Sequence, residues 1–255
     1  MPARLHHTVE GPANAPVLVL SNSLGTSLEM WDDQAPALAE RFRLVRFDSR
    51  GHGRSEVPGG PYAIEELGRD VLALLEELGL ERVHFCGLSM GGMTGMWLAI
   101  NAPERIDRLA LCSTSTHMPP AADWLERARV VRTEGMGAIA DGAIERWFSA
   151  PDGRPEAVQR VRQDLLDTPP EGYAASCEAI AAHDLRDQVA AITAPTLIIV
   201  GDEDPSTPPD HARFIASQVE GARLVELERA RHLLNVEHPD RVTRELLNHF
   251  NEENT

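Results

Sequence analysis

The feature that most constrains the fold of this chain is a regular alternation of short apolar runs with longer segments of helical periodicity. The apolar runs are continuous rather than alternating, which is typical of strands buried on both faces, and each is followed by a helical segment. This order predicts an α/β protein with a mostly parallel sheet covered by helices on both faces. The predicted strands are Val17 to Leu20, Leu44 to Phe47, Val83 to Leu88, Leu109 to Cys112, Thr196 to Val200 and Leu224 to Leu227. The predicted helices are Asp32 to Arg41, Ile64 to Leu78, Met90 to Ala102, Asp210 to Val219 and Pro239 to Phe250.

The alternation stops between residues 118 and 186, where no strand candidate occurs and the helical pattern is interrupted by prolines. We expect residues 118–186 to form a helical cap, inserted into a core made of residues 1–117 and 187–255. Open parallel sheets bind ligands at the carboxyl ends of their strands. We therefore expect the cap to lie over that edge of the sheet.

The charge balance limits the classes of binding partner that we expect for this chain. The chain has 24 basic and 40 acidic residues and a formal net charge of −16. Such an excess repels phosphate backbones and anionic lipid surfaces, so we expect neither nucleic acid nor a membrane as a partner. Every basic residue is an arginine, and the absence of lysine excludes Schiff-base chemistry and the phosphate-binding lysine of a P-loop.

Cysteine usage and the N-terminal residues indicate the cytoplasm. The three cysteines form an odd set without metal-ligand spacing, which is typical of free thiols in a reducing compartment. The first residues hold no apolar run of a signal peptide, and no stretch approaches the roughly 18 apolar residues of a membrane helix. We therefore expect a cytoplasmic protein without a metal site.

The run Gly87-Leu88-Ser89-Met90-Gly91-Gly92 lies between a predicted strand and a predicted helix, which is the context of a nucleophile elbow. Glycines permit a tight, strained turn that exposes the Ser89 hydroxyl, and the positive end of the following helix faces any developing oxyanion. The alternative is a glycine-rich turn with an incidental serine. The position between strand and helix favours Ser89 as a nucleophile.

A serine hydroxyl needs a base, and in this architecture an acid and then a histidine follow the serine, each after a later strand. The loop after the fifth predicted strand offers Asp202, Glu203 and Asp204. Asp204 lies deepest in that loop, whereas Asp202 at the strand end suits a turn. Among the histidines after Asp204, only His232 lies in the loop after the last strand. The order predicts a triad of Ser89, His232 and Asp204.

Two backbone N–H groups are needed to hold an oxyanion. One belongs to the residue after the nucleophile, Met90, and the other comes from the loop after the first predicted strand, where Ser23-Leu24-Gly25 indicates Leu24. The polar run from Asp48 to Ser55 also follows a strand. Asp48 precedes Ser89, which is the wrong order for a triad acid, so we interpret this run as structural bracing.

Several segments together resemble the 3-oxoadipate enol-lactonases of the α/β-hydrolase superfamily, over the whole length of the chain. The Asp48 to Ser55 run and the Cys86 to Gly92 run are shared by many hydrolases and discriminate weakly. The more specific segments are Ser21-Asn22-Ser23-Leu24-Gly25-Thr26 with Met30-Trp31, Arg132-Thr133-Glu134-Gly135-Met136 with Arg146-Trp147-Phe148, and Cys177-Glu178-Ala179-Ile180 with Asp184-Leu185-Arg186.

The resemblance implies an α/β-hydrolase fold and hydrolysis of a small carboxylated enol-lactone to 3-oxoadipate, in the β-ketoadipate route of aromatic catabolism, without metal or organic cofactor. The family's triad carries over to Ser89, Asp204 and His232. The alternatives on the same scaffold are a carboxylesterase, a carbon–carbon hydrolase of ring-cleavage products and a cofactor-free perhydrolase. A catalytically silent binding protein is the alternative outside enzymes, and the complete triad argues against it.

An acidic chain that binds an anionic lactone needs a local cation, and the planar fork of arginine suits a carboxylate. Trp124 and Arg127 are three residues apart in a predicted cap helix and therefore share a face. We predict that these two bind the substrate, with Arg132, Arg146 and Trp147 as further candidates in the cap. A solvated Arg127 paired with Glu126 or Asp123 is the alternative.

Overall fold

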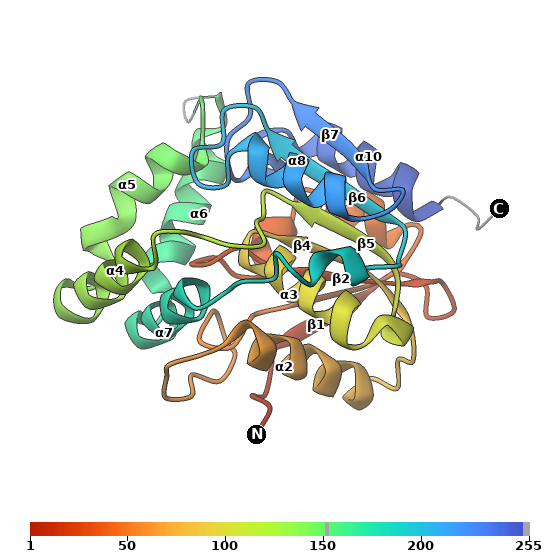
Figure 1. Cartoon of the computed structure of the whole chain (residues 1–255), viewed down its shortest axis with the longest axis horizontal. Coiled ribbons are helices and arrows are strands. Elements are labelled where there is room, and N and C mark those ends of the chain that lie inside the picture. The colour runs from red at the N-terminus through yellow and green to blue at the C-terminus, as the bar shows by residue number, and fades with distance from the viewer. Residues whose placement is uncertain (151–152, 252–255) are drawn as a thin grey trace.

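The computed structural model describes residues 1–150 and 153–251, and it contains a seven-stranded sheet in the order β1-β3-β2-β4-β5-β6-β7 (Figure 1). All neighbouring strands are parallel except β1, which runs antiparallel to β3. The strands are β1 (His7–Glu10), β2 (Val17–Ser21), β3 (Arg43–Phe47), β4 (Val83–Leu88), β5 (Ile106–Cys112), β6 (Thr196–Gly201) and β7 (Arg223–Leu227). The predicted α/β architecture with a mostly parallel sheet is confirmed.

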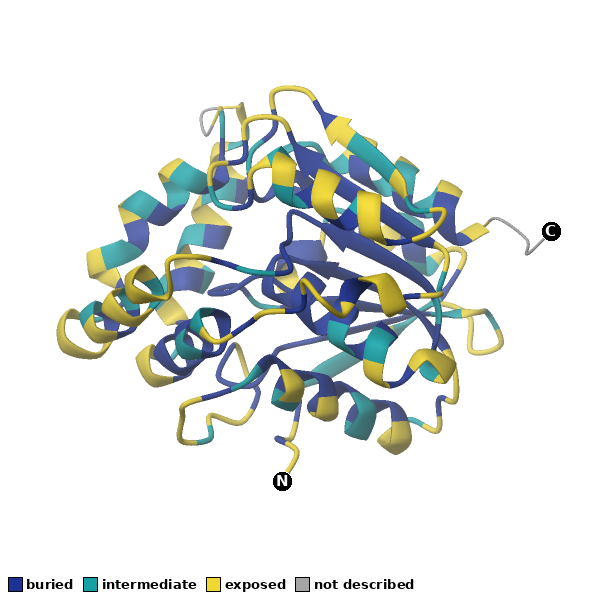
Figure 2. Ribbon diagram, in the orientation of Figure 1, coloured by how far each residue is buried: buried dark blue, intermediate teal, exposed yellow. Residues whose placement is uncertain are grey.

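Helices cover both faces of this sheet. One face packs against α2 (Ile64–Glu77), α3 (Met90–Asn101) and α8 (Pro209–Gln218), and the other against α1 (Ala35–Ala39) and α10 (Pro239–Asn251) (Figure 1). Because β4 and β6 are buried along their whole length, their sequences lack a polar face (Figure 2).

Helix α2 shows why the helical pattern could be identified from the sequence. Its residues Ile64, Leu67, Val71 and Leu74 recur at helical spacing and are all buried. At its start the Glu66 side chain accepts a hydrogen bond from the backbone N–H of Ala63, at 3.0 Å, which satisfies one of the free donors of the first turn.

Helices fill the region between β5 and β6 in which the sequence predicts a cap. They are α4 (Ala121–Glu134), α5 (Gly137–Trp147), α6 (Pro155–Asp167) and α7 (Pro170–Ala181). They lie together beside the sheet (Figure 1), and α4 packs closely against α7. In the described part of residues 118–186 no segment belongs to the sheet, as expected. The division of the chain into a core and a cap stays a prediction.

Strand β1 and helix α1 differ from the sequence prediction. Strand β1 was not predicted, because a four-residue edge strand that contains one apolar residue carries no apolar run. The predicted helix from Asp32 to Arg41 is too long. A 3-10 helix, η1 (Leu28–Trp31), comes first, and α1 starts next to Pro36, whose ring suits a first helical turn.

The register of the strands brings distant loops to one edge of the sheet. Ser21 at the end of β2 pairs with Gly87 of β4, and Cys112 at the end of β5 pairs with both Leu88 and Ile199. The loops that follow β2, β4, β5 and β6 therefore leave the sheet side by side. In the described part of the chain, no helix is both long enough and apolar enough to span a membrane.

Two buried histidines make the stability of this fold sensitive to acid. Burial lowers the pKa of His183 and of His249 to about 4, from an ordinary value of 6.5. Above pH 6.5 neither the folded nor the unfolded state holds the proton. Between about pH 6.5 and 4 the unfolded chain takes up protons that the folded chain excludes, so the free energy of unfolding falls in this window.

We predict that the free energy of unfolding, measured with urea, falls by about 2 kcal/mol per histidine between about pH 7 and pH 5. His249→Leu removes one of these groups, so the variant should lose less stability over this interval than the wild type. An equal loss in both proteins would contradict the prediction.

Candidate functional site

Ser89 lies at the sharp turn between β4 and α3. Its backbone has φ 55° and ψ −113°, a conformation that a residue with a side chain rarely adopts. The turn is held by the Ser89 N–H, which donates to the Cys112 carbonyl at 2.9 Å, and by the Thr114 hydroxyl, which donates to the Ser89 carbonyl at 2.7 Å. Strain of this kind persists only where surrounding contacts enforce it, and it is typical of functional sites.

The close approach of α3 to β2 explains one of the glycines of the elbow. A Cβ atom at Gly91 would lie 2.5 Å from the Ser21 carbonyl oxygen, which is backbone and cannot move aside. The Gly91 N–H also donates to the Asn22 carbonyl at 3.0 Å. The missing side chain therefore lets the start of α3 pack directly on the loop after β2.

His232 and Asp204 meet from loops that are 28 residues apart in the sequence. The Nδ1–H of His232 donates to Oδ2 of Asp204 at 2.9 Å, and both side chains are buried. The other oxygen of Asp204 accepts the backbone N–H groups of Ser206 and Thr207, at 2.8 and 3.0 Å. The Thr207 hydroxyl donates to Oδ2 at 2.7 Å.

These contacts decide the ionisation of Asp204. Burial by itself opposes the charged form, but the interaction with His232 and the hydrogen bonds from Thr207 outweigh it and lower the pKa of Asp204. A charged Asp204 holds the proton of His232 on Nδ1. The other ring nitrogen, Nε2, is then free of a proton and able to accept one.

The structure places the competing acid and histidines elsewhere. Asp202 is exposed, and its carboxylate lies 3.5 Å from the Ala230 N–H. The Nε2 atom of His238 bonds to the Arg229 carbonyl, and His249 packs in α10 against Phe250. Among the described residues, His232 is the histidine that is hydrogen-bonded to Asp204.

The loop after β2 forms a tight turn beside Ser89. Thr26 donates from its N–H and its hydroxyl to the Ser23 carbonyl, at 3.3 and 2.9 Å. Gly25 has φ +76°, a region that favours glycine, and its N–H donates to Nε2 of the fully buried His52 at 2.9 Å. Leu24, which lies between Ser23 and Gly25 in this turn, lines the same cavity as Ser89.

Met90 is the first residue of α3, so its N–H has no acceptor within the helix. The partial positive charge of a helix N-terminus adds to such a donor. The predicted oxyanion donors, Leu24 and Met90, therefore belong to two segments that both border Ser89. Their role in binding an oxyanion stays a prediction.

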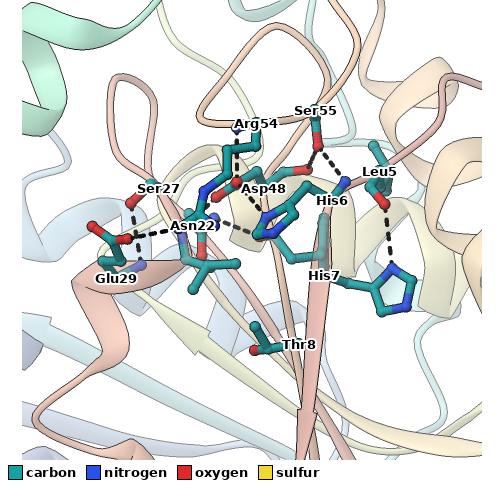
Figure 3. A network of polar contacts seen from close by, with 12 residues as sticks. Leu5, His6, His7, Thr8, Asn22, Ser27, Glu29, Asp48, Arg54 and Ser55 are labelled. Atoms are coloured by element: carbon teal, nitrogen blue, oxygen red, sulfur yellow. Dashed lines mark hydrogen bonds and ion pairs between the residues drawn. The ribbon is translucent and has the colours of Figure 1, made fainter.

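The Asp48 run braces this loop. Figure 3 shows the buried Asp48 carboxylate, which accepts from His6 Nδ1 and from the Arg54 N–H, at 3.0 Å each, and it also accepts the Leu28 N–H at 2.8 Å. The Ser55 hydroxyl donates to the Asp48 carbonyl at 2.6 Å (Figure 3). These contacts tie the N-terminal segment and the loop after β2 to the end of β3, as structural bracing requires.

Ser89 and His232 open into one cavity beneath the helices α4, α5 and α7. Four of the cap residues predicted to bind substrate, Trp124, Arg127, Arg146 and Trp147, line it. The full lining is Ser23, Leu24, Ser89, Met93, Met118, Trp124, Arg127, Ala143, Arg146, Trp147, Tyr173, Ile180, Ser206, Thr207 and His232. No carboxylate side chain belongs to this lining.

Arg132 is the exception among the predicted cap residues, because it does not line the cavity. Its guanidinium binds Glu171 at 2.8 Å and Glu178 at 2.5 Å, on α7. Its position in α4 turns it toward α7 instead of toward Ser89. Arg132 therefore joins two helices, and the sequence-based assignment to substrate binding is not supported.

Arg127 and Arg146 bring two positive charges into the cavity. The Arg127 guanidinium lies 4.5 Å from the centre of the Trp124 ring and lies near the buried Tyr173 hydroxyl. Burial and the neighbouring charge of Arg127 lower the pKa of Arg146. In the described part of the chain, neither arginine forms an ion pair with a carboxylate. Sparsely solvated guanidinium groups without a carboxylate partner favour binding of an anion.

Sequence reasoning missed Thr207 and Tyr173. Thr207 orients Asp204 and lies 3.4 Å from His232 Nδ1, and the threonine close behind the acid was the available signal. Tyr173 is fully buried beside Arg127, and nothing in its local sequence distinguishes it from a core residue.

Comparison with known proteins places these features in a family. A family model of the alpha/beta hydrolase fold matches residues 16–134 and 146–239. The 3-oxoadipate enol-lactonase 2 of Acinetobacter baylyi is 41% identical over 237 residues, which are 92% of this chain and 88% of that protein.

Two crystal structures are similar over almost the whole chain. The enol-lactonase from Burkholderia xenovorans has a TM-score of 0.96 and 45% identity, over 98% of this chain and 97% of that one. A hydrolase from Pseudomonas aeruginosa has a TM-score of 0.95 and 47% identity, over 98% of this chain and 95% of that one.

The packing of the elbow gives a prediction. Gly91→Ala should lower the free energy of unfolding by about 1 to 3 kcal/mol, because the added methyl group collides with the Ser21 carbonyl. Gly137→Ala is the control, since a Cβ there meets no atom within 4 Å. Urea unfolding of both variants measures the difference, and equal stabilities would show that the elbow tolerates a side chain.

Proposed function

Because this chain belongs to the α/β-hydrolase family and, within it, to the 3-oxoadipate enol-lactonases, we propose that it opens a small carboxylated enol-lactone with Ser89, His232 and Asp204. One observation carries the proposal. A single cavity has Ser89 and His232 in its lining together with two arginines that form no ion pair with any carboxylate in the described part of the chain. It therefore offers a nucleophile for an ester carbonyl and cations for the acid group of the same substrate.

In the first step, Ser89 Oγ attacks the lactone carbonyl while Nε2 of His232 takes the hydroxyl proton. Asp204, kept ionised by its contacts with His232 and Thr207, stabilises the imidazolium that forms. The N–H groups of Leu24 and Met90 hold the negative charge on the former carbonyl oxygen.

In the second step, the ring C–O bond breaks and the enol oxygen leaves with the proton from His232. The leaving group stays attached through the carbon chain, so the acyl-enzyme carries an enol that converts to a ketone. A water molecule, deprotonated by His232, then attacks the ester carbonyl. Collapse of this second intermediate returns the proton to Ser89 and releases 3-oxoadipate.

The carboxylate of the lactone fits the arginine end of the cavity. Arg127 is fixed in place by Trp124 and Tyr173, so little side-chain entropy is lost when it binds an anion. Arg146 adds a second charge on the neighbouring helix. This local field opposes the overall charge of −16, which by itself repels an anionic substrate.

The nucleophile is tested by Ser89→Ala. We expect kcat for the carboxylated enol-lactone to fall by several orders of magnitude, because the triad acts as a unit. Asp204→Asn should also lower kcat strongly, whereas the exposed Asp202→Asn serves as its matched control. More than about a tenth of wild-type turnover in Ser89→Ala would refute the assignment.

The carboxylate site is tested by Arg127→Ala. KM for the carboxylated lactone should rise by roughly tenfold to a hundredfold, which corresponds to about 1.5 to 3 kcal/mol for a charge-assisted hydrogen bond. Hydrolysis of a neutral aryl ester should stay near the wild-type rate. Arg129→Ala, on the exposed face of the same helix, is the control. Equal losses on both substrates would instead indicate damage to α4.

A further inference from the structure

The residues on either side of His232 are attached to one helix, α5. The Leu233 N–H donates to the Trp147 carbonyl at 3.1 Å, and the Arg231 guanidinium donates to the Glu145 carbonyl. Both acceptors lie in the last turn of α5. The loop that presents His232 is therefore joined to a helix that contributes Arg146 and Trp147 to the cavity.

The side chain of Glu237 makes a second connection between the same two segments. Its Oε2 accepts the Arg231 N–H at 2.9 Å. Its Oε1 accepts the Ser149 N–H at 2.7 Å, the Ser149 hydroxyl at 2.6 Å and the Ala150 N–H at 3.1 Å. One carboxylate thus satisfies donors from the histidine loop and from the chain just after α5.

Glu237 is itself fixed to the body of the protein. It ends the short helix α9 (Leu234–Glu237), in which Asn235 is fully buried. The Asn235 side chain donates to the Met30 carbonyl at 2.8 Å, and the Gln34 side chain donates to the Asn235 carbonyl at 2.9 Å. The Glu237 carboxylate is therefore anchored to the core while it holds the histidine loop and the segment just after α5.

We propose that Glu237 is a positioning residue that sets the imidazole of His232 against Ser89 by tying the histidine loop to the segment that directly follows α5. The inference rests on the proposed function, and it adds a coupling between the substrate-binding wall and the general base. Arg146 and Trp147, which line the substrate cavity, lie on α5, and the last turn of α5 is also bonded to the loop that carries His232. A displacement of α5 is thereby transmitted to His232.

The chemistry of the carboxylate suggests the decisive substitution. Both oxygens of Glu237 accept backbone N–H groups, but an amide has a single accepting oxygen and presents an NH2 group at the other end. In Glu237→Gln the NH2 group of the amide therefore faces a backbone N–H that needs an acceptor. Either the contact with Arg231 or the contacts with Ser149 and Ala150 are lost. A displacement of the base by about 1 Å is sufficient to lower a rate by about a hundredfold.

We expect Glu237→Gln to lower kcat by about tenfold to a hundredfold, on the carboxylated lactone and on a neutral aryl ester alike, with KM for the lactone unchanged. A fall in kcat with KM unchanged is the opposite of the effect expected for Arg127→Ala, which changes KM for the lactone alone. Glu66→Gln is the matched control, because Glu66 also accepts a backbone N–H but lies on α2, away from the site. It should keep the wild-type kcat.

A milder variant covers the case in which Glu237→Gln does not fold. Arg231→Ala removes the bond from the guanidinium to the Glu145 carbonyl and leaves the backbone intact. It should lower kcat by about threefold to tenfold, again with KM unchanged. Arg105→Ala is its control, since Arg105 likewise bonds to backbone carbonyls, those of Leu80 and Glu81, away from the site.

The outcomes separate the two proposals. An inactive Ser89→Ala together with wild-type kcat in Glu237→Gln and Arg231→Ala overturns the positioning role and leaves the proposed function intact. An active Ser89→Ala overturns the proposed function itself. A fall in kcat for Glu237→Gln with no fall for Glu66→Gln, and an unchanged KM, supports the coupling.

Discussion

The site depends on the packing of the turn at Ser89 against its two neighbouring strands. The strained backbone of Ser89 is held by bonds to the Cys112 carbonyl and from the Thr114 hydroxyl, and the glycine at position 91 lets α3 touch the loop after β2. Without that contact, the start of α3 and the turn at Leu24 would not border the same serine. The placement of the proposed nucleophile beside the predicted oxyanion donors therefore depends on one close approach between a helix and a strand end.

The charge of the cavity lining is positive, opposite in sign to the net charge of the whole chain. The protein carries a formal charge of −16, yet the lining of this cavity has two arginines and no carboxylate. Many other arginines are paired with acids, as Arg132 is with Glu171 and Glu178. Arg127 and Arg146 are partly buried and pair with no described carboxylate, so they favour an anionic ligand more strongly than surface arginines do.

Three carboxylates, two of them buried and one partly exposed, connect separate segments through hydrogen bonds. Asp48 braces the loop after β2, Asp204 orients His232, and Glu237 joins the histidine loop to the segment after α5. In each case a charged side chain accepts backbone or ring N–H groups that would otherwise be unsatisfied. The rigidity that catalysis needs thus comes from polar contacts between loops, on top of the apolar packing of the sheet.

The sequence by itself determined the parallel α/β sheet, the position of Ser89 and the order in which acid and base follow it. Each depends on local pattern: continuous apolar runs, a glycine-flanked serine between strand and helix, and loops that follow later strands. The sequence did not predict strand β1, because this edge strand lacks an apolar run. It also predicted too long a helix at α1, because Pro36 shortens that helix. The tertiary structure decided that Asp204 meets His232 while Asp202 faces solvent, and that Arg146 enters the cavity while Arg132 pairs with α7. These outcomes depend on how loops and helices are oriented against segments that are distant in the sequence. The local sequence pattern does not specify that orientation.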